Sequence, residues 1–494
     1  MNRREFMALS CAALLGGFAA GRRAAASTAV SPNIVYVLAD DLGWGDLRCM
    51  NPEGKIPTPH LDALARAGRV YTDAHSGSAV CTPTRYGILT GRYCWRGRLK
   101  SSVLEGWSPA LIEPGRMTVA SLLREQGYRT ACVGKWHLGL DWSTTDGARA
   151  GRDNTDYTGP VNNGPTALGF DEFFGIPASL DMPPYVYVRD DRVEEPPTGT
   201  IEASPKPAYY RAGPVAPGFK MEGVLDRLTD EAVGVVRRHH ERGDGKPLFL
   251  YYPLTAPHTP IFSTDEFRGK GETNAYGDFV FAVDAAVGRL RGALADAGMD
   301  ANTLFIFTSD NGCSPMAEFD ELRVLGHIPG GPFRGHKADI FEGGHRIPFI
   351  ASWPGRIPEG TTSADLVCLT DLMATAAAIT GATLPKDAGE DSWSMLDGLL
   401  GKPPSRPRPA VVHHSVNGTF AVREGQWKLV LGPDSGGWSP PKPGSPESKT
   451  LPKVQLYDME ADPGETLNLW DKHPEIVRRL EETLKRFKET GRSV

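Results

Sequence analysis

Cysteine is scarce in this sequence, with seven residues among 494. That number is too small for a disulfide scaffold, and no two cysteines have the Cys-x-x-Cys spacing of a structural zinc site. An excess of positive charge is also absent, because the formal net charge is −6, so nothing draws the whole chain to nucleic acid or to an anionic membrane. A local cationic pocket is compatible with this total. With 40% hydrophobic and 23% charged residues, the composition is that of a globular protein.

Long hydrophobic runs are missing too, and the apolar stretch near the N-terminus, Phe6 to Gly21, is too short for a membrane-spanning helix. Arg3 and Arg4 precede it, and Ala24 to Ala26 offers a small-residue cleavage site. Residues 1–26 therefore have the layout of a bacterial export signal, and the arginine pair resembles the twin-arginine type. An uncleaved anchor is the alternative.

Removing this leader would take away four arginines and one glutamate, which shifts the net charge from −6 to −9. We therefore expect an acidic exported protein, periplasmic or secreted, that binds neither nucleic acid nor membrane once the signal is removed. Five cysteines other than Cys11 and Cys81 would remain, and this odd number leaves at least one of them unpaired unless the chain dimerises through it.

Four continuous apolar runs are predicted to form strands that are buried on both faces, as in a parallel sheet. Patterns with helical spacing lie between them, at residues 58–68, 118–127, 225–236 and 279–290. This alternation predicts a doubly wound α/β fold, in which ligands bind at the carboxyl ends of the strands. The runs are residues 33–39, 128–133, 247–252 and 303–308, and they lead to Asp40, Lys135, His258 and Asp310, respectively.

The end of the chain has a different pattern. Residues 420–430 indicate an antiparallel hairpin, residues 454–457 a further strand, and residues 474–490 an amphipathic helix. We therefore expect a large catalytic domain, 27–386, and a small α+β subdomain with an antiparallel sheet, 387–494. Two long polar loops, residues 141–165 and 194–218, are candidates for walls that face the substrate.

The sharpest local signal is the run Cys81-Thr82-Pro83-Thr84-Arg85. Thr82 as the cap and Pro83 as the first helical residue would begin a short helix, with Cys81 at its amino end, where peptide dipoles favour an anion. Taken alone, such a cysteine is more often a packed core residue. The residues that follow, up to Leu89-Thr90-Gly91-Arg92, change this interpretation.

The whole run resembles the signature of the sulfatase family, of the type that includes arylsulfatases and N-acetylgalactosamine 6-sulfatases, in the alkaline-phosphatase-like superfamily. The resemblance implies that a maturation enzyme oxidises Cys81 to formylglycine, whose hydrate is the nucleophile. It extends over nearly the whole mature chain through several motifs in the family's order. Thr84 is a mild departure, since serine or alanine is commoner there.

Hard oxygen ligands follow two of the predicted strands. Carboxylates and an amide suit calcium or magnesium better than zinc, although Asp40-Asp41 by itself also fits a helix cap or a turn. The segment from Asp40 to Asp46 is similar to the metal-binding opening of sulfatases. The resemblance therefore implies one Ca2+, with magnesium left open, held by Asp40, Asp41, Asp310, Asn311 and the residue at position 81, Cys81.

Further motifs supply cations and imidazoles. Lys135-Trp136-His137 would be a solvated pair by default, but with its flanking glycines it resembles the family's Gly-Lys-Trp-His-Leu-Gly element. His258 would otherwise be a turn histidine, and the resemblance makes it the acid that protonates the leaving group. Lys337 matches the family's second sulfate-holding lysine.

These roles combine into one reaction, the hydrolysis of a sulfate monoester to an alcohol and inorganic sulfate. Arg85, Lys135, Lys337 and the metal would stabilise the charge of the sulfate. One hydroxyl of the hydrate would attack sulfur while Asp310 takes its proton, and His258 would protonate the alcohol. His137 would take the proton of the second hydroxyl, which expels sulfate.

Two other functions remain open at this stage. One is a phosphate or phosphonate monoester hydrolase of the same superfamily, since some of these also use formylglycine. The other is an exported binding protein without turnover. Export and the polar loops favour a sulfated carbohydrate as the substrate, while the sulfated position, exo or endo action and the oligomeric state stay open. Four tryptophans are candidates to stack on a sugar ring, or else core and loop anchors: Trp44, Trp95, Trp107 and Trp142.

Overall fold

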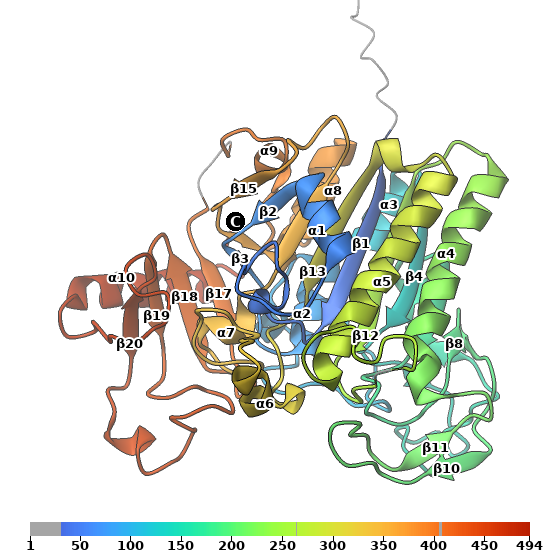
Figure 1. Cartoon of the computed structure of the whole chain (residues 1–494), viewed down its shortest axis with the longest axis horizontal. Helices are drawn as coiled ribbons and strands as arrows, with labels where there is room; N and C mark the ends of the chain where they lie inside the picture. Colours follow the sequence, from blue (N-terminus) through green and yellow to red (C-terminus); the bar gives the residue numbers. More distant parts are fainter. Residues whose placement is uncertain (1–30, 263, 405–407) are drawn as a thin grey trace, which may run out of the picture. The chain divides into compact units, whose positions relative to one another are not determined.

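A ten-stranded sheet forms the centre of the protein (Figure 1) in the computed structural model, which describes residues 31–262, 264–404 and 408–494. The five adjacent strands β13, β1, β12, β4 and β7 are parallel, and antiparallel or short strands lie outside them. In order across the sheet, the strands are β15 (Thr361–Ser363), β2 (Arg69–Tyr71), β14 (Phe349–Ser352), β13 (Thr303–Ser309), β1 (Asn33–Asp40), β12 (Leu248–Pro257), β4 (Arg129–Lys135), β7 (Glu172–Ile176), β8 (Val188–Arg189) and β9 (Arg192–Val193).

Helices cover both faces of this sheet, as Figure 1 shows. On one face, α4 and α5 pack against each other and against β12, and α1 packs on α5 and β14. On the other face, α2, α3 and α8 pack together, and α3 contacts β4. The doubly wound α/β prediction is therefore confirmed. The helices are α1 (Pro59–Arg66), α2 (Cys81–Thr90), α3 (Val119–Glu125), α4 (Val224–Arg242), α5 (Ala275–Asp296), α6 (Phe319–Val324), α7 (Glu342–His345), α8 (Leu372–Thr380), α9 (Leu396–Leu399) and α10 (Pro474–Glu489).

The continuous apolar runs explain why the central strands lie between two helical layers. Every residue of β12 and β13 is buried, and seven of the eight residues of β1 are buried as well. Burying one large aliphatic side chain contributes about 1.5–3 kcal/mol, so strands without a polar face are most stable when both faces are covered. Short strands lie outside this sheet: β3 (Ala74–His75) with β16 (Val367–Cys368), β5 (Asp141–Trp142) with β6 (Val161–Asn162), and β10 (Gly199–Ile201) with β11 (Gly213–Val215).

A four-stranded antiparallel sheet with the order β17-β18-β19-β20 follows near the end of the chain. The amphipathic helix α10 packs on β18 and β19 through Ile476, Leu480, Leu484 and Phe487, which are buried. The predicted hairpin, strand and helix are confirmed, and β17, with its two histidines, is an addition. The boundary between 386 and 387 stays a prediction. The strands are β17 (Val411–His414), β18 (Phe420–Glu424), β19 (Trp427–Val430) and β20 (Gln455–Asp458).

The predicted export signal, residues 1–26, lies outside the described residues. In the part of the chain that the structure describes, no helix is both long enough and apolar enough to cross a membrane. Within the same residues the cysteines from Cys49 to Cys368 are all free thiols, so no disulfide joins them.

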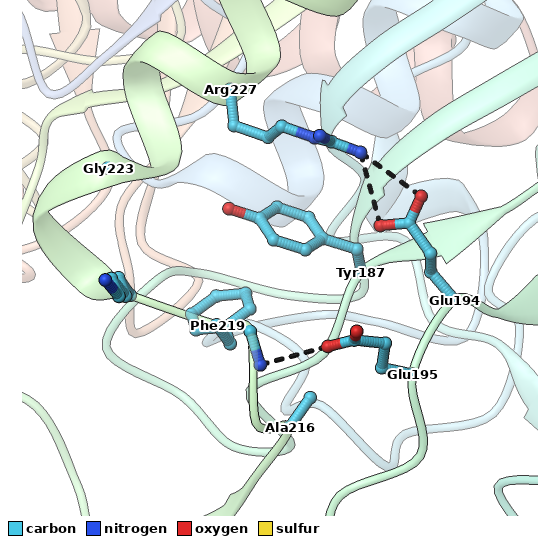
Figure 2. A pocket seen from close by; sticks show the side chains of 9 residues that line it. Tyr187, Glu194, Glu195, Ala216, Phe219, Gly223 and Arg227 are labelled. Carbon is cyan, nitrogen blue, oxygen red and sulfur yellow. Dashed lines mark hydrogen bonds and ion pairs between the residues drawn. The ribbon is translucent and has the colours of Figure 1, made fainter.

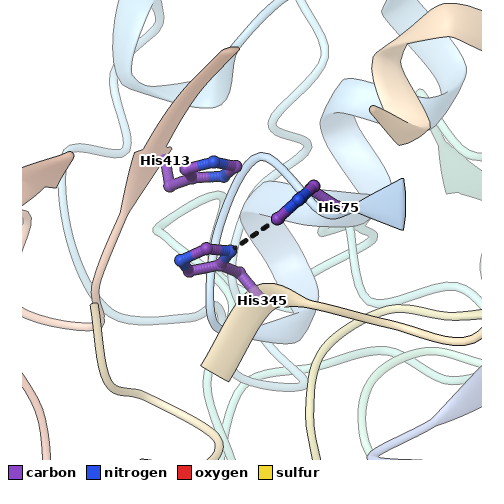
Figure 3. A group of neighbouring side chains, drawn as sticks. All are labelled: His75, His345 and His413. Atoms are coloured by element: carbon purple, nitrogen blue, oxygen red, sulfur yellow. Dashed lines mark hydrogen bonds between the residues drawn. The ribbon is translucent and has the colours of Figure 1, made fainter. Parts of the chain in front are cut away.

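Three buried histidines join the C-terminal sheet to the rest of the chain (Figure 3): His75 in β3, His345 at the end of α7 and His413 in β17. The Nδ1 atoms of His75 and His345 are 3.1 Å apart, and His75 Nε2 lies 2.7 Å from an oxygen of Asp73. Lys428 Nζ donates to His345 Nε2 at 3.0 Å. Hydrogen bonds therefore run from β19 through two imidazoles to the segment that precedes β3.

A histidine triad of this kind is often a metal site, and its ring nitrogens are close enough to suggest one. The rings of His345 and His413, however, stack with centroids 3.9 Å apart and planes only 9° apart. The nitrogen lone pair lies in the plane of its ring, so two nearly parallel rings cannot direct their lone pairs at one ion. We therefore interpret the triad as a structural contact between neutral imidazoles.

Burial lowers the pKa of His75, His345 and His413, whereas in an unfolded chain a histidine titrates near pH 6.5. Below that pH the unfolded chain binds protons that the folded protein does not bind, so stability falls as the pH falls. Each such histidine should remove about 1.4 kcal/mol per pH unit from the free energy of unfolding. We predict that His413→Asn reduces this slope between pH 6.5 and 5, measured by urea denaturation at constant ionic strength.

The control is His240→Asn, since His240 is exposed on α4. It should leave the pH dependence of the unfolding free energy as in the parent protein. The explanation fails if the parent, His413→Asn and His240→Asn all lose stability at the same rate as the pH falls.

Candidate active site

The carboxyl ends of the five adjacent parallel strands bring the predicted site residues together. Parallel strands present these ends at the same edge of the sheet, where ligands bind in open α/β folds. The residues that lie there are Asp310 directly after β13, Asp40 at the end of β1, His258 directly after β12, Lys135 at the end of β4, and Ser179, which follows β7.

Helix α2 begins at Cys81, with Val80 as its N-cap residue. The expectation that Thr82 caps the helix and Pro83 is its first residue is therefore wrong. Pro83 is tolerated in the first turn because the first four N–H groups of a helix have no partner within the helix. Thr82 Oγ1 instead accepts a hydrogen bond from Leu104 N at 3.2 Å. Cys81 does lie at the amino end of the helix, as predicted.

Three cations pair with three buried carboxylates, and Arg85 faces two of them, because its Nη2 also lies 3.6 Å from Asp40 Oδ1. Lys135 Nζ lies 2.6 Å from Asp40 Oδ2 and also donates to Ser179 Oγ at 3.1 Å. Arg85 donates to Asp310 Oδ2 from Nε at 3.1 Å and from Nη2 at 2.8 Å, and its Nη1 donates to the Lys135 carbonyl oxygen at 2.9 Å. The third pair is Lys337 with Asp41, at 2.7 Å.

The backbone around the carboxylates is held in unusual conformations. Asp41 and His137 have φ angles of 66° and 56°, in the left-handed region that residues other than glycine rarely adopt. A Cβ on Gly312, next to Asn311, would lie 1.8 Å from the Gly343 carbonyl oxygen, so only glycine fits there. Such strained or crowded positions concentrate at functional sites.

The oxygen donors of the site suit a hard cation, while the cluster of possible ligand atoms also includes the Cys81 thiol and the His258 imidazole and leaves out the predicted ligand Asp310. Ligand atoms of Asp40, Asp41, Cys81 and His258 all lie within 4.8 Å of one another. Asn311 Nδ2 donates to Asp41 Oδ1 at 2.7 Å. Asp40 Oδ1 and Asn311 Oδ1 are buried and have no hydrogen-bond partner among the described residues. Unpaired buried oxygens beside clustered carboxylates are what calcium or magnesium requires.

Burial and the neighbouring opposite charges shift the pKa values of these groups in opposite directions. Burial and the neighbouring Asp40 carboxylate raise the pKa of Asp310, while the cations, Lys135 foremost, outweigh burial and lower the pKa of Asp40. Burial favours neutral Lys337, but Asp41 raises the pKa of this ammonium group. Burial raises the pKa of the Cys81 thiol to about 12, against the lowering effect of Lys135 and Lys337.

Two histidines at the site have defined ring orientations. His137 Nε2 lies 2.8 Å from the Leu104 carbonyl oxygen, so Nε2 carries the proton, and Nδ1 has no partner in the described chain. Burial, followed by Lys135 and Arg85, lowers the pKa of His137. His258 Nδ1 lies 2.7 Å from the Thr259 carbonyl oxygen, and Nε2 lies 3.5 Å from Asp41 Oδ2.

A cavity of about 460 Å³ opens onto these groups. Cys81, His137, His258 and Lys337 line it, while Arg85 and Lys135 lie behind its wall, fully buried. Asp40, Asp41, Asp310 and Asn311 are buried behind it as well. Lining residues that the sequence motifs did not indicate include Ser179, Asp181, Lys206, Tyr209, Arg211 and Trp438.

The loop 194–218 contributes Lys206, Tyr209 and Arg211 to this cavity, as expected of a substrate-facing wall. The loop 141–165 contributes none of the lining residues that the structure describes. The four candidate tryptophans are not among the described lining residues either. Trp95 and Trp142 are buried, and Trp44 and Trp107 pack partly buried against the core. Trp438 lines the cavity instead, and its distance along the chain from every motif explains why the sequence did not reveal it.

A second cavity, of about 480 Å³, lies between the β8–β9 hairpin and the start of α4 (Figure 2). Arg227 donates to Glu194 at 3.2 Å across its upper edge, and Gly218 N donates to Glu195 at 2.9 Å below. Its acidic side chains are thus satisfied by neighbouring groups. None of the predicted site residues is among its described lining residues, so the chemistry expected from the sequence concentrates at the first cavity.

The chain is similar to known proteins over most of its length. The family profile described as Sulfatase matches residues 32–382. The chain is 34% identical over 498 residues to the N-acetylgalactosamine-6-O-sulfatase of Bacteroides thetaiotaomicron, covering 92% of this chain and 93% of the relative. It is also 34% identical over 471 residues to arylsulfatase A of Bos taurus, covering 91% and 86%.

A solved structure from work on the metabolism of multiple glycosaminoglycans by Bacteroides thetaiotaomicron has the same fold, with a TM-score of 0.80 at 33% identity. The match covers 93% of this chain and 100% of that one. The profile match spans most of the chain, and the relatives cover nearly all of it. On these grounds, this chain belongs to the sulfatase family of sulfuric ester hydrolases.

Proposed function

We propose that the protein is an exported sulfatase that hydrolyses sulfate monoesters of carbohydrates to an alcohol and inorganic sulfate. The observation that carries this proposal is the convergence of Cys81, His137, His258 and Lys337 on one cavity, in front of three buried aspartates. A cationic floor beside an imidazole suits an anionic ester whose alcohol must be protonated as it leaves. Residues 1–26 would direct export, by the twin-arginine route, to the periplasm or beyond.

Asp40, Asp41, Asp310, Asn311 and the residue at position 81 would hold one Ca2+. The unpaired oxygens of Asp40 and Asn311 support this assignment. When bound, the ion supplies positive charge that polarises the sulfate ester. Lys135 and Arg85 fix the orientation of the carboxylates through the contacts described above, so both act as positioning residues in this scheme. Lys337 lines the cavity and would contact sulfate oxygens.

Position 81 would carry formylglycine, formed from Cys81 by a maturation enzyme. When present, the hydrated aldehyde supplies one hydroxyl as the nucleophile for sulfur and a second whose deprotonation releases sulfate. A thiol or a serine hydroxyl lacks that second group. Position 81 lies at the amino end of α2, where the helix dipole favours negative charge.

Two imidazoles would move the protons, with Asp310 as a further acceptor near position 81. His258 Nδ1 donates to the Thr259 carbonyl, and Nε2 lies 3.5 Å from Asp41 Oδ2. His258 would therefore protonate the leaving alcohol from Nε2 in its imidazolium form, in which both ring nitrogens carry a proton. His137 donates through Nε2 to Leu104 and keeps a lone pair on Nδ1, and its lowered pKa leaves it neutral. It is therefore suited to accept a proton rather than to give one.

The relatives guide the choice of substrate. The Bacteroides thetaiotaomicron protein is named for the 6-O-sulfate of N-acetylgalactosamine, and we propose a 6-sulfated amino sugar for this chain as well. Tyr209 and Trp438 on the cavity wall support a sugar ligand, since aromatic faces pack on apolar faces of sugar rings. A phosphate or phosphonate hydrolase and a binding protein without turnover are the alternatives.

We predict that the purified protein hydrolyses 4-nitrophenyl sulfate with a kcat/KM about tenfold or more above that for 4-nitrophenyl phosphate, a difference of at least ~1.4 kcal/mol in activation free energy. The two esters share one leaving group, so the comparison isolates the transferred group. Cys81→Ala, measured in parallel, gives the background from contaminating enzymes. A larger rate on the phosphate would favour the phosphatase alternative, and no turnover of either ester would favour the binding protein.

The modification at position 81 has a direct chemical readout. Mass spectrometry of the peptide that contains Cys81 should show an aldehyde in place of the thiol in active protein. Cys81→Ser should lower kcat on the aryl sulfate by about a thousandfold or more, because the second hydroxyl is missing. Cys49→Ser, at a free cysteine away from the cavity, should change neither the modification nor kcat. An unmodified thiol in fully active protein contradicts this mechanism.

The metal assignment predicts a loss of aryl sulfate hydrolysis after dialysis against a chelator, and its recovery with Ca2+. Isothermal titration of the metal-free protein should give tighter binding for Ca2+ than for Mg2+. Asp41→Asn should weaken Ca2+ binding by about tenfold or more, because it removes one negative ligand. Asp265→Asn, an exposed residue paired with Arg268, is the matched control and should bind Ca2+ like the parent. Full activity of protein free of metal would exclude this role.

A further inference from the structure

Asp181, in the loop after β7, places a buried carboxylate in the wall of the active-site cavity. The residue is only 4% exposed. Its Oδ2 accepts a hydrogen bond from Arg211 Nη1 at 2.9 Å, while Oδ1 has no hydrogen-bond partner among the described residues. Buried polar atoms nearly always have a partner, so an unpaired carboxylate oxygen in a binding cavity indicates a ligand that donates to it.

We infer that Asp181 and Arg211 form a hydroxyl-binding pair that recognises the sugar, with Asp181 Oδ1 accepting a hydrogen bond from a ring hydroxyl of the residue that carries the sulfate. This inference rests on the proposed function and specifies how the site selects a sugar rather than any sulfate ester. Arg211 holds the carboxylate in place and presents further N–H donors to the same ligand.

The position of Asp181 relative to His258 supports a ligand for Oδ1 rather than a role in the proton relay. Oδ1 lies 4.0 Å from His258 Nδ1, which is too long for a hydrogen bond, and Nδ1 contacts the Thr259 carbonyl at 2.7 Å instead. His258 would protonate the leaving oxygen, so the group next to it is the alcohol part of the substrate. A carboxylate there repels a second sulfate and attracts a neutral hydroxyl donor.

The pair is also rigid before any ligand arrives. Arg211 N donates to the Asp181 carbonyl oxygen at 3.1 Å. The hydroxyl of Tyr185, a buried side chain, lies 3.1 Å from the Asp181 carbonyl oxygen and 2.6 Å from that of Arg211. The fixed backbones, together with the burial of Asp181 and its hydrogen bond to Arg211, hold the carboxylate in one orientation, which favours specific recognition of one hydroxyl position.

The C-terminal part of the chain supplies an aromatic side chain to the same cavity. Trp438 lines the same cavity, and its backbone N–H donates to Asp339 Oδ1 at 2.7 Å, two residues beyond Lys337. The residue before it, Gly437, has no room for a Cβ, which would lie 2.5 Å from the Ala338 carbonyl oxygen. The backbone of Trp438 is therefore fixed, and an indole together with a carboxylate offers the apolar and the polar contact that a sugar ring needs.

The test compares Asp181→Asn with the parent enzyme on N-acetylgalactosamine 6-sulfate and on 4-methylumbelliferyl sulfate, which has no ring hydroxyl. Hydrogen bonds to charged groups are worth a factor of about 10 to 100. We expect Asp181→Asn to lower kcat/KM on the sugar sulfate about 10 to 100 times more strongly than it lowers kcat/KM on the aryl sulfate. For the parent enzyme, kcat/KM should be lower by a similar factor on either the 3-deoxy or the 4-deoxy sugar sulfate than on the full sugar sulfate. For Asp181→Asn, removing the same hydroxyl from the substrate should lower kcat/KM little further.

The matched control is Asp265→Asn, which should keep the parent's ratio of sugar to aryl rates. Equal losses on both substrates would overturn the inference, because Asp181 would then act on His258 or on folding. The absence of any loss on the sugar would overturn it as well. A parent enzyme that cleaves the aryl sulfate but no faster on the sugar refutes the hydroxyl pair and leaves the sulfatase proposal standing, whereas failure on both esters refutes that proposal itself.

Discussion

The site depends on the balance between buried carboxylates and buried cations at one edge of the sheet. Three aspartates at most 1% exposed would repel one another and would be costly to ionise in isolation. Three cations compensate the three aspartates, with Arg85 shared between Asp310 and Asp40, so the group is close to neutral before any metal binds. A divalent ion added to it then leaves a net positive charge to bind an anionic ester. The pairs are Asp40 with Lys135, Asp41 with Lys337, and Asp310 with Arg85.

The parallel sheet provides the rigidity that this balance requires. Residues from β13, β1, β12 and β4 enter the site from neighbouring strands whose registers are fixed by ladder hydrogen bonds. Helix α2, fully buried, then brings Cys81 to the same edge and directs Arg85 at Asp310. A charge network of this kind tolerates little displacement, because each lost partner would leave an unpaired charge in the interior.

The C-terminal sheet contacts the rest of the protein through buried side chains and also contributes a residue to the active-site cavity. Its strands β17 and β19 carry His413 and Lys428, which join it to His345 and so to the segment after Lys337. The loop that follows β19 carries Trp438 to the cavity wall. The network around the proposed catalytic groups is thus built by the large sheet, whereas the face that would meet the sugar is completed by the small one.

By itself, the sequence determined the family, the α/β class and the short motifs, because Cys81, Lys135 and His258 stand next to strand and helix signals that depend only on local spacing. Only the tertiary structure decided what lies between motifs: that Arg85 and Lys135 lie behind the cavity while Lys337 lines it, that helix α2 begins at Cys81, and that Asp181, Arg211 and Trp438 line the same cavity. These contacts join residues far apart along the chain. Their positions follow from strand order and packing, which hydrophobic periodicity and local propensity do not encode.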